Sequence, residues 1–395
     1  MIRHLLKLVW NRKRENAIVI AEILLSFLVL FFVLIMSVTY ISNWRRPLGF
    51  HYDNVLVLKT DIDYGLVGAK NPEVRGQLER LAAEARAFPE VQSVAFSSTP
   101  PYNLSTSATE KVINGKKASF VIDEVSDDFA KTMGVEVVRG RWFSAEDNSA
   151  HWSPFVIDEN AARTLFGDED PIGKKIEYVD NGAGRIVGVV KPYRKDGETM
   201  SPPNMMFRRA MYGADGELPR NMVLRVRPGA TAEFEEKLLQ RMQSVAPAMA
   251  FDLRSMDRMR SMQLRMVCTP VIAGGIVALF LIAMVALGLT GVMWQNVTKR
   301  TREIGLRRAM GASGPAVHRQ ILSEVALLAT VSVAVGSAIV FQLPILGVFR
   351  LVTPAAFTAG FAGALATIYG LTLLCGLYPS WLAARLEPAE ALRYE

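Results

Sequence analysis

Four long apolar stretches divide this chain, and their placement constrains the fold more than any other feature of the sequence. One lies near the N-terminus, at residues 17–42, and three lie in the last third, at residues 268–293, 321–348 and 355–379. Each reaches the roughly 20 residues that an α-helix needs to cross a bilayer. The sequence therefore predicts four membrane spans, with a large polar domain at residues 43–267 between the first two.

The distribution of charge orients these spans. The whole chain has 45 basic and 38 acidic residues, and residues 43–267 hold 31 of each. The remaining 14 basic and 7 acidic residues therefore account for the whole net charge of +7. Most of this excess lies in residues 1–16 and 294–320, and short cytoplasmic loops collect Lys and Arg. We therefore expect a multi-pass protein of the cell (inner) membrane with both termini in the cytoplasm and residues 43–267 extracytoplasmic. Because the basic residues flank spans, the bilayer accounts for them and no nucleic acid partner is expected.

The polar domain contains two segments with the same strand, helix, strand pattern. Residues 43–99 carry the first and residues 221–256 the second, and two such βαβ units can pair into one ferredoxin-like sheet. Residues 100–220 would form an inserted, mostly β subdomain, in which residues 199–212 are predicted to be irregular. The expected elements are 54–59, 72–88 and 91–96, then 118–125, 154–158, 175–179 and 185–190, then 222–227, 230–245 and 251–254.

The fold class that follows is membrane α-helical (four transmembrane helices) plus an α+β extracytoplasmic domain, a ferredoxin-like βαβ pair with an inserted, mostly β subdomain. No helix breaker lies in residues 257–267, so we expect a helical stalk that continues into the second span. The remaining segments are an amphipathic N-terminal segment at 1–16, a cytoplasmic segment at 294–320, a short outer loop at 349–354 and a cytoplasmic tail at 380–395.

No catalytic, cofactor or metal site is expected from the motifs. Residues 167–174 resemble a phosphate-binding loop, but the glycine spacing is too long and Lys175 stands where that loop has Ser or Thr. Residues 182–188 have the wrong glycine spacing for a dinucleotide site and predict a hairpin turn. The histidines at 4, 51, 151 and 318 lack zinc spacing. Cys268 and Cys375 fall at or inside spans, so we expect no disulfide in the outer domain.

Several acidic residues leave two interpretations open. Residues 123, 124, 127 and 128 form an acidic cluster that is either a calcium site or, as we favour, a solvated face with a helix N-cap. Glu22 and Glu324 lie within spans, where ionisable groups face the protein interior or a partner. The side chain of each residue either makes an interhelical contact or extends to the headgroup layer.

The cytoplasmic segment at residues 296–312 is the sharpest signal in the chain. It predicts a short amphipathic helix along the inner membrane face, with Glu303 and Arg307 paired at i, i+4 and Gly311 as C-cap. Its run Arg-Thr-Arg-Glu-Ile-Gly-Leu-Arg-Arg-Ala-Met-Gly-Ala at 300–312 resembles the hallmark of MacB/FtsX-type ABC transporter permeases, as does the tail at 387–395. Residues 129–143 and 158–174 are similar to blocks of the MacB-like periplasmic core domain.

The resemblance implies a non-enzymatic, four-span permease subunit without a fused ATPase. Such a permease couples ATP hydrolysis by a separate cytoplasmic ATPase, which binds the ATP and Mg²⁺, to movement of the outer domain, for export or handling of a peptide, drug or lipoprotein. The residues that the resemblance assigns to ATPase coupling are Arg300, Arg302, Glu303, Ile304, Gly305, Arg307, Arg308 and Gly311.

The resemblance also implies further partners. These are a second permease chain in a homo- or heterodimer, the lipid bilayer, and a periplasmic adaptor or substrate protein. Three alternatives stay open: a membrane sensor with a ligand-binding outer domain, an FtsX-like regulator of cell-wall hydrolases, and a membrane-anchored hydrolase with an unrecognised site.

Overall fold

The chain divides into two compact units, which are described separately. One is Asn43–Val267, and the other combines Met1–Ser42 with Cys268–Glu395. The computed structural model describes residues 13–61, 72–103, 108–113, 115–149, 152–177, 183–210, 219–299, 306, 310, 313–347 and 352–385.

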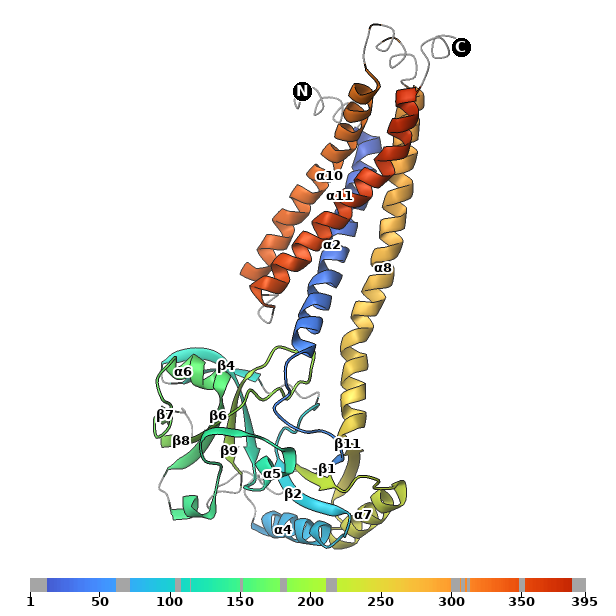
Figure 1. Cartoon of the computed structure of the whole chain (residues 1–395). Helices are drawn as coiled ribbons and strands as arrows, with labels where there is room; N and C mark the ends of the chain where they lie inside the picture. The colour runs from blue at the N-terminus through green and yellow to red at the C-terminus, as the bar shows by residue number, and fades with distance from the viewer. Residues whose placement is uncertain are drawn as a thin grey trace. The chain divides into compact units, whose positions relative to one another are not determined.

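A mixed β-sheet forms the centre of the unit Asn43–Val267 (Figure 1). Within the described ranges its order is β11-β1-β10-β2-β4-β9-β6-β8-β5, with β3 added to β4 and β7 to β8. The strands are β1 (Val55–Asp61), β2 (Val91–Ser97), β3 (Ala108–Ile113), β4 (Lys116–Val125), β5 (Val137–Gly140), β6 (Ser153–Asp158), β7 (Lys175–Glu177), β8 (Ala183–Val190), β9 (Asn204–Arg209), β10 (Asn221–Val226) and β11 (Ala250–Ser255). The helices are α4 (Pro72–Arg86), α5 (Phe129–Met133), α6 (Glu159–Phe166) and α7 (Ala232–Val245), with a 3-10 turn, η1 (Ala145–Ser149).

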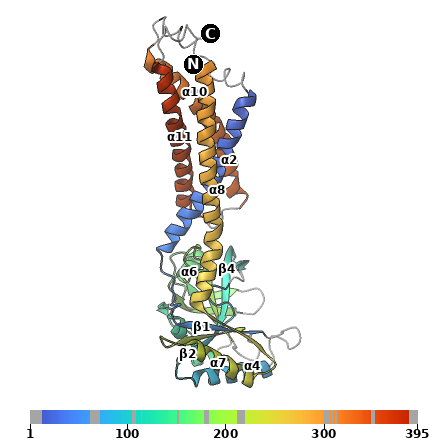
Figure 2. The same cartoon turned by 90° about the vertical axis from the view of Figure 1, so that its right-hand side faces the viewer.

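Four strands and two helices make the ferredoxin-like part of this unit. In the sheet order β11-β1-β10-β2 every neighbouring pair is antiparallel. Helices α4 and α7 join β1 to β2 and β10 to β11, and they lie side by side (Figures 1 and 2). The start of α7 is set by Thr231, whose side chain accepts a hydrogen bond from the backbone N–H of Phe234. This arrangement confirms the predicted fold class.

The two faces of that sheet bury different residues, because side chains alternate along a strand. Leu56 and Leu58 of β1 face α4 and α7, where they pack with Leu78 and Leu238. Val55 and Val57 point to the other face, which is covered by α5 and by the loop after β8. The second face therefore carries the connections between the ferredoxin-like part and the inserted subdomain.

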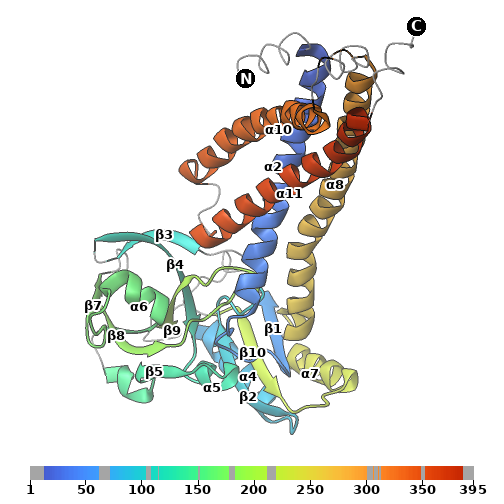
Figure 3. The ribbon, with the colours of Figure 1, turned by 45° about the horizontal axis from the view of Figure 1, so that its top comes forward.

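The inserted subdomain continues the same sheet rather than forming a separate one. It joins β2 through the pairing of Ser97 with Val125, and α6 packs on β6 and β9 (Figure 3). The prediction that residues 199–212 are irregular was wrong for β9, which pairs parallel with β4 and antiparallel with β6. Met205, Met206 and Phe207 are fully buried, and burial of this short apolar run outweighs the effect of the preceding prolines. Residues 211 and 212 lie outside the described residues.

The other unit contains four helices long and apolar enough to cross a membrane. Within the described part of the chain they are α2 (Lys13–Trp44), α8 (Met256–Lys299), α10 (Gly314–Ile345) and α11 (Pro354–Arg385) (Figure 2). Helix α8 has 44 residues, with Pro270 inside it, and runs from the end of β11 through its apolar stretch. At 1.5 Å per residue it is about 66 Å long, roughly twice the thickness of a bilayer core.

Candidate functional site

The residues assigned to ATPase coupling cannot be placed in space. Arg300, Arg302, Glu303, Ile304, Gly305, Arg307, Arg308 and Gly311 lie outside the described residues. Of this segment the structure describes Leu306 and Met310, which are 53% and 73% exposed. The assignment therefore stays a prediction that rests on the resemblance.

Glu22, one of the two intramembrane acids, faces a neighbouring helix. Its side chain on α2 is half-buried and lies against Gly288 of α8, where a Cβ would come within 2.6 Å of the carboxylate Oε2. A glycine at 288 therefore gives the Glu22 carboxylate the room to approach α8. Glu324 on α10 is also half-buried.

Small residues bring the membrane helices together around α2. A Cβ at Gly360 of α11 would lie 3.0 Å from the Cα of Ile35, so the two backbones meet at this point. Phe31 packs edge-on against Phe357, with ring centroids 5.3 Å apart. The Ser332 hydroxyl of α10 donates to the Ile20 carbonyl oxygen at 3.1 Å. Such close contacts between small residues and backbone hold helices together where no hydrophobic driving force acts between them.

Helix α8 is much less covered than α2. Only 11% of its most apolar stretch is buried, against 39% for α2. Large apolar side chains cover its free surface, among them Ile272, Ile276, Leu279, Phe280 and Leu287. This surface is therefore free for lipid or for another chain.

In the unit Asn43–Val267, the loop between β8 and β9 makes many polar contacts with distant segments. We call residues 191–203 the β8–β9 loop. Arg194 lies in it and is 1% exposed. Its Nη1 donates to the carbonyl oxygens of Asn43 at 2.8 Å and Arg46 at 3.0 Å, and its Nη2 donates to those of Glu198 at 2.7 Å and Met200 at 2.8 Å. Burial lowers the pKa of Arg194, and the nearby charge of Arg46 lowers it further.

The same loop holds an ion pair with α8. Glu198 Oε1 accepts from Arg260 Nε at 2.5 Å and from the Tyr102 hydroxyl at 3.4 Å, and the two charged side chains are 8% and 23% exposed. Burial and the Glu198 charge raise the pKa of Tyr102, so the hydroxyl stays a donor. The Arg260 guanidinium also lies over the ring of Tyr52, 4.8 Å from its centroid. Separation of the two partners of a buried ion pair leaves an uncompensated buried charge, so it costs much free energy.

Two aspartates of the inserted subdomain act as structural acceptors. Asp158 Oδ1 accepts from the backbone N–H groups of Ala161 at 2.8 Å and Met205 at 3.1 Å, so that it caps α6 and fixes β9. Burial raises its pKa to about 7. Asp123 accepts from the hydroxyl of Ser97 and, at 3.0 Å, from the N–H of Ser98, and burial raises its pKa to about 6.

The interpretation of the acidic cluster as a solvated face was wrong for Asp123 and Glu124, while the side chain of Asp128 is 55% exposed. Asp123 is 0% and Glu124 is 9% exposed, because the two side chains, on opposite faces of β4, are each covered by polar partners from neighbouring segments. Glu124 pairs with Arg208, and Asp127 binds Arg209 through two hydrogen bonds. Asp128 does occupy the N-cap position of α5, without a side-chain cap bond. The signal in the sequence that could have indicated this pairing is the opposite charge of the acidic residues at 123–128 and of Arg208 and Arg209 in β9.

The segments that the sequence resembled but did not match as nucleotide-binding motifs have structural roles in the described residues. Residues 167–174 connect α6 to β7, where Lys174 pairs with Glu169 on the surface. Strand β7 pairs antiparallel with β8, but the predicted turn at 182–188 was wrong for residues 183–188, whose backbone pairs with β6 and β7 as part of β8. Gly188 lies inside β8 against the Arg141 carbonyl oxygen. No group of three or more His, Cys, Asp or Glu side chains that could hold a metal is found among the residues that the structure describes.

Comparison with family models matches both units. The MacB-like periplasmic core domain matches residues 24–241, and the FtsX-like permease C-terminal domain matches residues 275–388. The chain belongs to the MacB/FtsX family of ABC transporter permeases. The match at residues 275–388 includes the run at 300–312 from which the resemblance was drawn.

Curated relatives of this permease are macrolide export ATP-binding/permease proteins named MacB. That of Agrobacterium fabrum is 28% identical over 82% of this chain and 52% of its own length, and that of Bordetella avium is 26% identical over 80% and 48%. The chain thus spans about half the length of the curated relatives it matches. Among solved structures, the periplasmic region of MacB from Actinobacillus actinomycetemcomitans matches 54% of this chain and 94% of its own, at 15% identity and a TM-score of 0.39.

Proposed function

We propose that this chain is the permease subunit of an ABC complex and converts ATP hydrolysis by a separate cytoplasmic ATPase into movement of the outer domain. Membership of the permease family implies an ATPase partner in general. The observation that carries the proposal is the unbroken helix α8, which leaves the sheet directly after β11 and continues through the apolar stretch. Rigid secondary elements are the parts of a protein that carry displacement over tens of ångströms.

The contact with the ATPase is assigned to residues 300–312, which follow the end of α8 at Lys299. The charge pattern favours a cytoplasmic position for this segment, with residues 43–267 outside the inner membrane. ATP and Mg²⁺ would then be bound entirely by the ATPase.

The cargo in this proposal is handled by the outer domain rather than passed through a channel. Four spans in one chain are few for a wide aqueous pathway, and the described spans pack through Gly360 and aromatic side chains. A peptide, drug or lipoprotein engaged from outside fits this architecture. A second permease chain is part of the proposal, supported by the large exposed apolar surface of α8.

Co-purification tests the proposal. The full chain, solubilised from its own membranes, is compared with Glu303→Lys and Gly305→Trp, and with Glu79→Lys on the exposed surface of α4 as a charge-matched control. We expect wild type and Glu79→Lys to co-purify with an active P-loop ATPase, and the two variants in the coupling segment to lose it. If folded wild-type chain brings down no ATPase, the permease proposal fails and a sensor function becomes the leading alternative.

A further inference from the structure

The β8–β9 loop contacts the outer ends of both α2 and α8, and the contacts at α2 have an unusual chemistry. The Arg194 guanidinium is buried, and the four hydrogen bonds described above all go to backbone carbonyl oxygens. Helix ends leave their last carbonyls without intrahelical donors, and the helix dipole makes that end negative. Asn43 is one of these last residues, so Arg194 satisfies the end of α2 with a positive charge that needs no carboxylate partner.

A second hydrogen bond runs in the opposite direction between the same two segments. The Asn43 side chain is 1% exposed, and its Nδ2 donates to the Thr199 carbonyl oxygen at 3.0 Å. The end of α2 and the loop are therefore held by donors from both sides. Displacement of either segment alone would leave a buried guanidinium and a buried amide without acceptors, which is costly.

On α8, two residues one turn apart bind the same loop. Arg260 pairs with Glu198, and Gln263 Nε2 donates to the Asp196 carbonyl oxygen at 2.5 Å. Residues at i and i+3 lie on one face of a helix. This face of α8, just before its apolar stretch, is thus fixed to the loop at two points.

The loop is in turn fixed to the sheet, so a displacement of the helix ends is passed on to the sheet. Tyr193 is fully buried between the rings of Phe50, Phe129 and Phe207. Gly197 has a φ of +79°, and a Cβ there would lie 2.7 Å from the Tyr102 ring. The chain is therefore closely packed between its anchor at Tyr193 and its ion pair at Glu198.

We propose that the β8–β9 loop is a strap that makes the outer ends of α2 and α8 move together with the sheet, and that Arg194 is its central positioning residue. The inference rests on the proposed function, since it names the element through which displacement of two spans reaches the outer domain. It assigns a role in coupling to residues 191–203, which are separate from the segment at 300–312 that the resemblance assigns to ATPase coupling. Without the strap, α8 would still enter β11 directly. Helix α2 would keep the linker at residues 45–54 and its contacts with α8, such as the Arg260 guanidinium 5.8 Å from the ring centroid of Trp44, but no direct bond to the loop.

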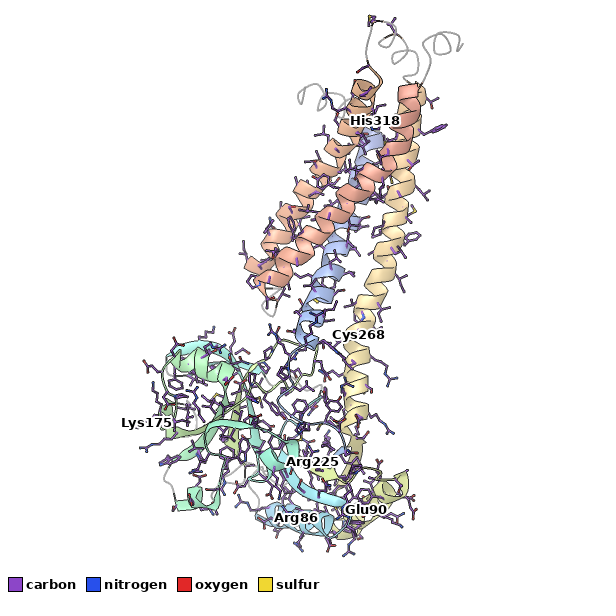
Figure 4. The ribbon with its side chains drawn as sticks, in the orientation of Figure 1. Arg86, Glu90, Lys175, Arg225, Cys268 and His318 are labelled. Atoms are coloured by element: carbon purple, nitrogen blue, oxygen red, sulfur yellow. The ribbon has the colours of Figure 1, made fainter. Side chains whose placement is uncertain are left out.

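The test uses the full chain in complex with its ATPase. Arg194→Gln and Arg194→Lys are compared with Arg225→Gln, because Arg225 (labelled in Figure 4) also donates to three backbone carbonyls, those of His51, Asp53 and Thr132, none of them in α2 or the loop. Two quantities are measured: hydrogen exchange of the amides at 43–46 and 194–200, and the ATP-dependent change in distance between spin labels at Glu79 and Leu346. Both label sites are exposed.

We expect both Arg194 variants to raise exchange at these amides at least tenfold, because Lys lacks the planar fork that reaches four acceptors. They should keep ATP turnover but lose most of the distance change, whereas Arg225→Gln keeps both wild-type exchange at these amides and the distance change. The proposal is overturned if exchange there is unchanged, or if the distance change survives in Arg194→Gln. Where wild type itself binds no ATPase, the proposed function fails, and the exchange result alone still decides whether Arg194 fastens α2.

Discussion

The buried carboxylate of Asp158 gives a quantitative prediction. The residue is fully buried, and its Oδ1 accepts from two backbone N–H groups in α6 and β9. In Asp158→Asn the amide oxygen can keep both acceptor bonds, while the negative charge is lost. The Oδ2 acceptor, which binds the Asn160 Nδ2 at 3.3 Å, is lost as well. That loss is the same at every pH, so the pH dependence of the difference reports the cost of burying the charge.

The magnitude follows from the shift in the pKa of Asp158. Burial raises it from 3.8 to about 7, so the folded state holds a proton that the unfolded state releases. Stability from this group is fully present below pH 3.8 and is lost as the pH rises through 7. A shift of roughly 3 units at 1.36 kcal/mol each amounts to about 4 kcal/mol at pH 8. The unfolding free energy of Asp158→Asn minus that of wild type should therefore increase by about 4 kcal/mol between pH 4 and pH 8.

Pulse proteolysis of the detergent-solubilised chain in urea measures this difference at pH 4, 6 and 8. The control is Asp147→Asn, a carboxylate 1% exposed beside Arg141. Burial raises the pKa of Asp147, but the bonds from Arg141 and the Ser144 N–H outweigh burial and lower it overall. Wild type should keep its advantage over that variant above pH 3.8 and lose it below. A difference for Asp158→Asn that is flat or falls between pH 4 and pH 8 would refute the reasoning.

Three further predictions concern packing and charge. Gly360→Leu should lower the thermal midpoint of the full chain in detergent strongly, because its side chain meets the Ile35 backbone, whereas Gly370→Leu on the same helix has no neighbour within 4 Å of its Cβ and should change it little. Gly288→Ala places a methyl 2.6 Å from the Glu22 Oε2, so it should destabilise wild type more than a Glu22→Ala background in a double-mutant cycle, with Gly291→Ala as the neutral control. Arg208→Met should cost about 3 kcal/mol of unfolding free energy, because it removes the positive partner of the buried Glu124 carboxylate. Lys237→Met, at the exposed pair with Glu233, should leave the unfolding free energy nearly unchanged, because solvent screens that pair.

The sequence predicted the elements whose pattern is local. Thr231 and the apolar stripe of Phe234, Leu238 and Met242 define α7, and alternation along β1 places its side chains on two faces. The span lengths follow from the same kind of reasoning, since about 20 apolar residues suffice for a crossing. The family assignment rested on residues 300–312 and was confirmed by the match of the FtsX-like domain.

What the sequence could not predict was the burial of charged residues. Arg194 and Glu198 stand in a stretch that reads as a solvated loop, yet both are buried, because their partners are the end of α2 and Arg260, far away in the chain. Asp123 was misread for the same reason, since its donors come from residues 97–99. Only the tertiary fold brings these acceptors and donors together, so no local pattern indicates them.

The central claim is that ATP-driven displacement travels along α8 to the outer domain. The most direct measurement is the distance between labels at Glu79 and Leu346 in the complex with its ATPase, with and without ATP, in wild type and in a variant with Pro-Gly-Pro inserted after Ser261. Closely spaced prolines remove backbone donors and clash with the preceding turn, so they break a helix that tolerates glycine, as Gly274 and Gly275 inside α8 show. The account predicts a shift with ATP in wild type and none in the insertion variant, at unchanged ATP turnover. A shift that persists after the insertion, or no shift in wild type that turns over ATP, would contradict it.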